Sequence, residues 1–311
     1  FMKVDSFMQT GDTNEALKTL EAAMLDKQYV RERSWIFGWY LNILLMSDRV
    51  DEAGGKFAAV IGRDEEMTRA GFSLFYGYYQ RKNDAAALEA WIKKMMGAGL
   101  PKDLMAQTYS WQLGLYRSKE EWDKILELVP VCFRQFDGAT NRRILGDLVM
   151  GELGAQKYDN AVKLMDAMEK EGAAVKEIKD FVAIERVDML FLQDKWPEAE
   201  QGFVKVAPGL GDGELAGWFA RAMGQCFGKS QLDLADKLCE YVLKSQKNKA
   251  GTWRGGAFQW IEVAKARKNL ALIPSRLEAL KGMNVSPQVL LELYRNEFYT
   301  VLGGNQKEQV V

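Results

Sequence analysis

Apolar residues recur along this chain three or four positions apart, which is the spacing of amphipathic helices. The stretch 34–61 shows the pattern clearly. It has an apolar run over 34–46, a polar turn at 47–49, and a second helix whose apolar side carries Ala53 and Phe57. No stretch alternates polar and apolar residues as a half-buried strand would. The pattern therefore predicts an all-α protein.

The same helix–turn–helix unit recurs along the chain. A small or apolar residue opens the second helix of each pair, and successive copies lie 34 to 39 residues apart: Ala16, Ala53, Ala87, Trp122, Ala161, Ala199, Ala235 and Ile273. A helix pair of this length cannot bury its apolar side alone, so neighbouring pairs must stack. We expect a right-handed superhelical α-solenoid of about eight helix pairs.

The predicted array covers residues 1–284, with a truncated first pair that retains only part of its first helix. Residues 285–311 are predicted to form a capping helix over 286–302, followed by a polar tail. A terminal helix that covers the last apolar face is what a solenoid needs. Because the sequence begins with a helical pattern, we expect it to be a piece of a longer precursor.

The first helices carry a recognisable set of positions, with large, apolar, small and aromatic residues spaced 3, 1 and 3 apart. These positions read as follows in the second, fourth, seventh and eighth pairs: Phe37, Tyr40, Leu41, Leu44; Ala106, Tyr109, Ser110, Leu113; Phe219, Ala222, Met223, Cys226; and Ala257, Trp260, Ile261, Ala264. In this respect the chain resembles the tetratricopeptide-repeat (TPR) family across nearly its whole length. The sixth pair departs from the pattern with Arg186, and the fifth with Glu152.

The resemblance implies that the first helices line an inner, concave surface that binds a partner. By register, the residues on that surface would be Trp35, Trp39, Asn42, Arg69, Tyr76, Trp111, Arg143 and Arg221, together with Met150 and Trp218. Aromatic residues, Arg and Met are enriched at binding hot spots. We therefore expect a non-enzymatic protein–protein interaction scaffold that binds a peptide or an extended protein segment on its concave face.

Composition removes several kinds of chemistry. The chain has no histidine, which excludes imidazole bases, Ser-His and Cys-His nucleophiles and histidine metal sites. Its three cysteines show no CxxC spacing, and we expect Cys226 and Cys239 to be buried free thiols on facing helices. No apolar run is long enough to span a bilayer. We expect no cofactor, no metal and no membrane span.

Two other functions remain open at this point. All-helical toroids that are rich in Trp and Tyr include carbohydrate-active enzymes with paired carboxylates. Two helix endings, KKMMGAGLPKD and KEGAAVKE, resemble pentatricopeptide repeats, which bind single-stranded RNA. The 42 basic and 43 acidic residues nearly cancel, which argues against a nucleic-acid partner.

Three further expectations concern details. Asn42 and Arg69 could contribute to a clamp for a peptide carboxylate, but Gly38 stands where a lysine would complete it. Self-association would use the ends of the solenoid. Sparse cysteine suits a reducing compartment such as the cytoplasm, and it also suits a periplasmic protein whose signal segment was removed.

Overall fold

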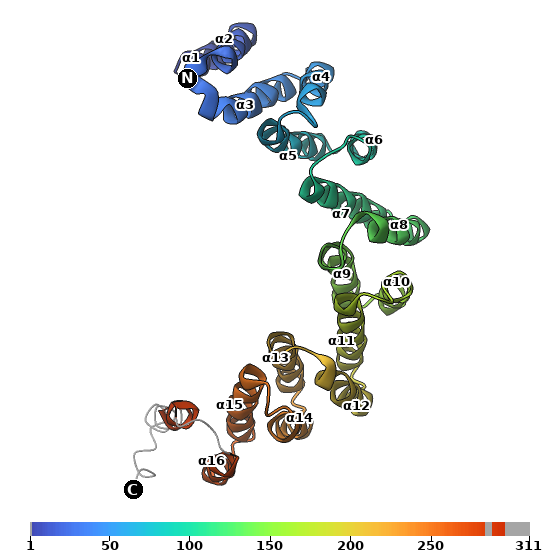
Figure 1. Cartoon of the computed structure of the whole chain (residues 1–311), viewed down its shortest axis with the longest axis vertical. Helices are drawn as coiled ribbons and strands as arrows, with labels where there is room; N and C mark the ends of the chain where they lie inside the picture. Colours follow the sequence, from blue (N-terminus) through green and yellow to red (C-terminus); the bar gives the residue numbers. More distant parts are fainter. Residues whose placement is uncertain (1, 284–287, 296–311) are drawn as a thin grey trace. The chain divides into compact units, whose positions relative to one another are not determined.

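The computed structural model describes residues 2–283 and 288–295. Within these residues every regular element is a helix, which confirms the all-α prediction. Figure 1 shows the elements in chain order. The helices are α1 (Met2–Thr10), α2 (Thr13–Leu25), η1 (Lys27–Glu32), α3 (Arg33–Met46), α4 (Val50–Val60), α5 (Glu65–Lys82), α6 (Ala85–Met96), α7 (Lys102–Ser118), α8 (Trp122–Gln135), α9 (Gly138–Gly154), α10 (Tyr158–Glu171), α11 (Lys176–Leu192), α12 (Trp196–Val206), η2 (Ala207–Gly209), α13 (Asp212–Gly228), α14 (Leu232–Ser245), α15 (Ala250–Ala266) and α16 (Leu272–Gly282).

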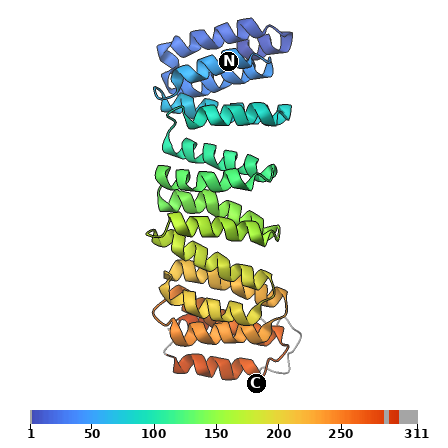
Figure 2. The same ribbon diagram turned by 90° about the vertical axis from the view of Figure 1, so that its right-hand side faces the viewer.

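The chain divides into two compact bodies. The N-terminal body contains Phe1–Val149 and Asp166–Gly172, and the C-terminal body contains Met150–Met165 and Ala173–Val311. Within each body, successive helices lie side by side (Figure 2). In the N-terminal body α3 packs on α4 and on α5, and in the C-terminal body α13 packs on α14 and on α15. Each of these two first helices therefore contacts the second helix of its own pair and the first helix of the next pair.

One turn geometry joins the first to the second helix throughout the chain. Its central residue is left-handed, with φ between 54° and 78°, and it recurs every 35 to 38 residues at Gly11, Asp48, Asn83, Glu120, Gln156, Asp194, Ser230 and Lys268. The next backbone N–H donates to a carbonyl five residues earlier, as from Arg49 to Leu44 (2.9 Å) and from Gln231 to Cys226 (2.7 Å). This pair of features defines a Schellman turn, which satisfies carbonyls at a helix C-terminus.

The turn gives a common register for the second helices. The fifth residue after each left-handed residue is buried in all eight cases: Ala16, Ala53, Leu88, Ile125, Ala161, Ala199, Ala235 and Ile273. Six of these match the predicted opening residues. In the third and fourth pairs the sequence had indicated Ala87 and Trp122, which are only half-buried. Both residues lie at the start of their second helices, α6 and α8, but one and three residues before Leu88 and Ile125, which face the core.

The same register corrects the pattern predicted for α7, which is the first helix of the fourth pair. Its turn lies at Glu120, so the four patterned positions are Tyr109, Gln112, Leu113 and Tyr116 and not the set three residues earlier. All four side chains are buried. The predicted pattern was displaced because Gln112, a polar residue, occupies one of the core positions.

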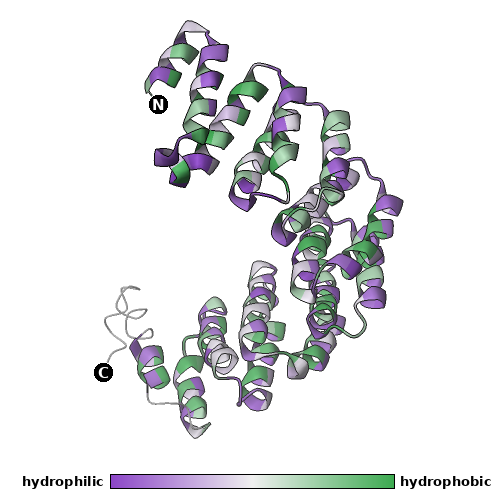
Figure 3. Cartoon of the chain, turned by 45° about the horizontal axis from the view of Figure 1, so that its top comes forward, coloured by the Kyte–Doolittle hydropathy of each residue, from purple (hydrophilic) through white to green (hydrophobic). Residues whose placement is uncertain are grey.

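Most helices carry both apolar and polar residues, as the colours of Figure 3 show. In the N-terminal body the apolar sides meet in a core that includes Leu41, Phe57 and Phe75. In the C-terminal body the core includes Phe203 and Phe219. This arrangement follows the helical periodicity from which the fold class was predicted.

All three cysteines are buried and free. Burial raises the pKa of Cys132 to about 12 and that of Cys226 to about 12. The Cys239 thiol lies 3.9 Å from the Met223 sulfur. The prediction of buried free thiols at Cys226 and Cys239 is confirmed.

Part of the predicted terminal helix lies within the described residues. Residues 288–295 are helical, and Leu293 is buried against the cluster formed with α15 and α16. Glu292 forms an ion pair with Arg254 of α15 (2.5 Å). The predicted start of this helix at 286, its end near 302 and the polar tail lie outside the described residues.

Candidate functional site

Helices α3, α5 and α7 of the N-terminal body share a face that is open to solvent. Positions 2, 6, 9 and 13 before the left-handed turn residue repeat with the helical period, so they fall on one side of each helix. None of these residues is buried, and Arg81 is the only charged one. We call this set the aromatic face: Trp35, Trp39, Asn42 and Met46; Ala70, Leu74, Gly77 and Arg81; Gln107, Trp111, Gly114 and Ser118.

The α3 part of the aromatic face exposes large apolar side chains. Trp35 is 56% exposed and Met46 is 68% exposed. The Trp35 and Trp39 rings lie 5.3 Å apart, and the Asn42 amide approaches the Met46 sulfur at 3.6 Å. Because the opposite sides of α3 are buried, this helix is apolar towards the core and towards solvent. Exposed apolar surface of this kind is typical of a contact surface.

Stacked rings connect α5 to α7. Trp111 is nearly parallel to Tyr76, with centroids 3.8 Å apart, and to Phe72, with centroids 4.9 Å apart. The Gln80 amide donates to the Tyr76 hydroxyl (2.8 Å). Such stacking contributes to packing beyond the area it buries. Tyr76 and Trp111 were predicted to face a partner, and the structure shows that both rings connect neighbouring helices.

Arg69 is engaged within the protein. Its guanidinium donates to Glu65 one helical turn earlier and to both carboxylate oxygens of Asp103 on α7. These two carboxylates raise the pKa of Arg69. A peptide carboxylate bound by Asn42 and Arg69 would have to displace both. The geometry gives no support to the clamp that the sequence analysis had disfavoured.

The corresponding positions of the C-terminal body have a different character. On α11, α13 and α15 they are Phe181, Glu185, Asp188 and Leu192; Gly217, Arg221, Gly224 and Gly228; and Gly255, Gln259, Glu262 and Ala266. This set has four charged side chains and no tryptophan, whereas the aromatic face has one charge and three tryptophans.

Charged and aromatic side chains connect α11 to α13. Asp188 accepts from the Trp218 indole N–H (2.6 Å) and from the Arg221 guanidinium (3.1 Å), and Glu185 lies 3.6 Å from the same guanidinium. Burial raises the pKa of Asp188 although Arg221 opposes the shift. Trp218 had been placed on the concave surface by register; that placement was wrong, since its side chain is fully buried.

The predicted site residues therefore separate into groups. The Trp35 and Trp39 rings contact each other on α3. The Tyr76 ring of α5 contacts the Trp111 ring of α7. Arg143 is exposed on the part of α9 that belongs to the N-terminal body.

Arg221 belongs to the C-terminal body, as does Met150, which is 46% exposed. Sequence reasoning missed Arg81 and Asp188. Counting back from each turn residue, in place of matching a family pattern, would have found both.

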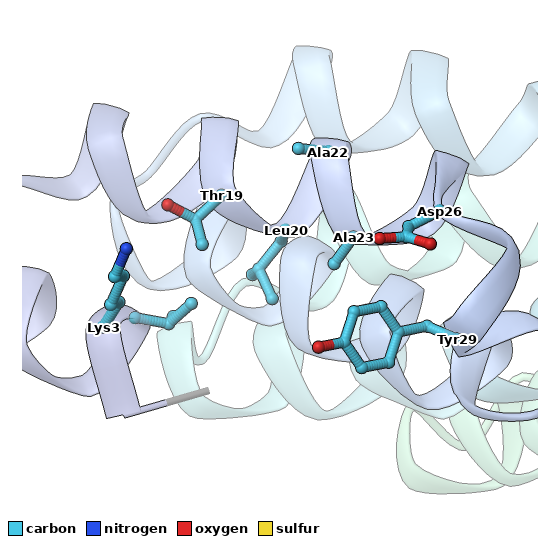
Figure 4. Close-up of a pocket in the computed structure, with 8 residues that line it drawn as sticks. Lys3, Thr19, Leu20, Ala22, Ala23, Asp26 and Tyr29 are labelled. Atoms are coloured by element: carbon cyan, nitrogen blue, oxygen red, sulfur yellow. The ribbon is translucent and has the colours of Figure 1, made fainter.

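A separate pocket of about 260 Å³ is formed by α1, α2 and η1 (Figure 4). Val4, Leu20 and Ala23 supply apolar lining. Lys3 lies towards one end, and Asp26 lies towards the other. The Asp26 carboxylate already accepts from the backbone and side-chain N–H groups of Gln28. This pocket shares no residue with the aromatic face.

Among residues 2–283 and 288–295, no group of three or more Cys, Asp or Glu side chains is arranged to hold a metal ion. In the same part of the chain, no helix combines the length and apolarity needed to cross a membrane.

No model of a protein family matches the sequence. No curated protein matches it significantly.

Proposed function

We propose that this chain is a TPR-like α-solenoid of about eight helix pairs with a C-terminal capping helix. The support is the recurrence of one Schellman turn every 35 to 38 residues, each followed by a buried residue at the same position. Helix pairs joined by one repeated turn are the unit from which such arrays are built.

We further propose that the chain acts as a non-enzymatic scaffold that binds a peptide or an extended protein segment on the aromatic face. The observation that carries this proposal is the exposure of Trp35 and Met46 on a face with a single charge. Protein interfaces are depleted of charge at their centre and enriched in aromatic residues, Met and Arg. A Trp on such a surface offers a large, rigid contact area.

Two observations, one from each body, argue against the two alternatives. An RNA-binding surface needs several cations to neutralise phosphates, and the aromatic face supplies Arg81 alone. A glycosidase needs two carboxylates that are free to act on substrate. Asp188 and Glu185, on neighbouring turns of α11, are instead tied to Arg221.

The proposal can be tested with a displayed library of short random peptides selected on the whole chain. We expect selected peptides to bind the unaltered protein and to bind a Trp35→Gln, Met46→Gln variant about tenfold more weakly, because both anchors are lost. A matched control is Val204→Gln, which replaces a 40% exposed apolar residue of α12. All replaced residues are exposed, so the unfolding temperature should be nearly unchanged.

Equal affinity for the double variant and the control would show that the aromatic face is not the binding surface. Failure to select any peptide would contradict the scaffold function itself. Light scattering during the affinity measurement would identify self-association of the chain, which would also lower the amount of peptide bound.

A further inference from the structure

Arg81 occupies a distinctive position at the C-terminal end of α5. It is exposed, and a methyl group added at Gly77 would lie 3.4 Å from its Nη1 atom. Gly77 precedes Arg81 by one helical turn on the same side of the helix. The guanidinium therefore lies along the aromatic face, over the space that Gly77 leaves free.

Neighbouring basic residues are paired, and Arg81 is not. Arg69 binds Glu65 and Asp103, and Lys82 forms an ion pair with Asp48 (2.7 Å). Within residues 2–283 and 288–295, Arg81 forms no ion pair. No other position of the aromatic face carries a charge that could neutralise it. The face therefore presents one unneutralised cation among apolar and uncharged polar side chains.

The chemistry of that cation favours a carboxylate. A guanidinium at the edge of an apolar surface binds a carboxylate through charge-assisted hydrogen bonds, often with two parallel contacts. A phosphorylated segment brings close to two negative charges and is usually bound by a cluster of Arg residues. One arginine matches one carboxylate.

We infer that the segment bound by the aromatic face carries an Asp or Glu side chain that pairs with Arg81, beside apolar side chains that pack on Trp35, Trp39 and Trp111. This inference rests on the proposed function and adds the chemistry of the partner. The ligand is thus an apolar segment with an acidic residue. Arg81 is the specificity-determining residue for the acid.

Parallel selections of the random-peptide library test the inference. The library is selected on the unaltered chain, on Arg81→Gln, on Arg81→Lys and on Arg134→Gln. Arg134 is an exposed arginine of α8, so its replacement removes the same charge away from the aromatic face. Each Arg81 variant replaces an exposed side chain, and circular dichroism verifies that the helices are retained.

We expect Asp and Glu to be enriched among peptides selected on the unaltered chain and on the Arg134→Gln control. The enrichment should be lost with Arg81→Gln while apolar residues remain selected, and Arg81→Lys should restore part of it. An acidic peptide from the first selection should bind Arg81→Gln about fivefold more weakly, as expected for one solvent-exposed, charge-assisted contact.

Two results would overturn the inference and leave the proposed function intact. One is selection of apolar peptides without acidic residues. The other is an acidic preference that persists in Arg81→Gln. Failure to select any peptide on the unaltered chain would overturn the proposed function and this inference together.

Discussion

Helices α5 and α7 of the N-terminal body and helices α11 and α13 of the C-terminal body are joined by different chemistry at similar positions. Between α5 and α7, Trp111 stacks on Tyr76 and Phe72. Between α11 and α13, Asp188 binds Trp218 and Arg221. Both pairs of helices end in the same left-handed turn. The turn therefore does not dictate how successive first helices are connected.

Both sets of contacts hold helices together, but they differ in how much surface they leave for a partner. In the C-terminal body Glu185 and Asp188 are paired with Arg221, so little remains to recognise a partner through these three groups. In the N-terminal body the stacked rings keep part of their surface accessible, and Trp35 and Met46 are exposed beside them. Exposed apolar area remains available for binding, whereas a paired charge must first lose its partner.

The largest expected effect tests what the two bodies share. Gly71 of α5 and Gly256 of α15 both lie 12 residues before their turn residue, where neighbouring side chains approach closely. An added methyl group would lie 2.7 Å from Phe57 at Gly71 and 2.8 Å from Val242 at Gly256. We expect Gly71→Ala and Gly256→Ala each to lower the free energy of unfolding by about 1–3 kcal/mol, measured by urea denaturation.

Gly114→Ala is the matched control for those two variants. No atom would lie within 4 Å of its added methyl group, so we expect a gain of about 0.5–1 kcal/mol from helix propensity. A loss in all three variants would show that close approach is not the cause.

The hydrogen bond from the Trp218 indole N–H to Asp188 connects α11 to α13 in the C-terminal body. Asp188→Leu leaves the buried Trp218 indole N–H without its acceptor, and we expect it to cost about 1–3 kcal/mol of unfolding free energy. Asp188→Asn keeps an acceptor oxygen and should cost much less. Equal losses for the two variants in a thermal or urea melt would mean that the hydrogen bond is not what matters.

Acid titration should distinguish carboxylates of the two bodies. Glu89 of α6 binds Lys119 (2.5 Å) and Lys93 (2.7 Å), which lower its pKa to about 2. A lowered pKa contributes stability above the pKa of the unfolded chain, near 4.3, and the contribution is lost as pH falls towards 2. We expect Glu89→Gln to cost about 1 kcal/mol at pH 7, since both lysines are partly exposed, and nothing near pH 2.

The raised pKa of Asp188 gives its contribution to stability the opposite dependence on pH. Its protonated form is favoured by folding, so its contribution is greatest below the unfolded pKa and is lost as pH rises through the folded value. Chemical denaturation of Asp188→Asn across the same pH range checks this. An identical pH profile for the Glu89 and Asp188 variants would contradict the contrast.

The smallest effect tests the shared turn. Lys268 adopts φ of 54°, a conformation that is strained for residues other than Gly. We expect Lys268→Gly to raise the unfolding free energy by about 0.5–1 kcal/mol. Gly11→Ala, at φ of 78°, should lower it by about 1 kcal/mol. Changes of the same sign would show that the two turns are not equivalent.

Much of the fold could be predicted from the sequence because helical periodicity is strong. Each residue predicted to open a second helix, from Ala16 to Ile273, lies in an observed second helix. The exact register was harder to predict. Gln112 is buried at a core position, and among residues 2–283 and 288–295 neither polar atom of its side chain has a hydrogen-bond partner. A polarity pattern cannot anticipate such a residue, and the fourth pair was misaligned as a result.

The candidate site could be predicted only in part. Trp35 and Trp39 were identified because α3 has more apolar positions than one packing face needs. The internal ion pairs of Arg69 depend on Asp103, 34 residues later, and no local pattern indicates them. The place of Arg81 on the aromatic face became apparent only once the turn fixed the register of α5.

Hydrogen–deuterium exchange with a peptide selected on the unaltered chain would test the central claim most directly. We predict slower exchange in α3, α5 and α7 upon binding, and unchanged exchange in α11, α13 and α15, because ligand binding stabilises the elements it contacts. Protection confined to α11 and α13 would contradict the account, since it would place the binding surface on the charged positions of the C-terminal body.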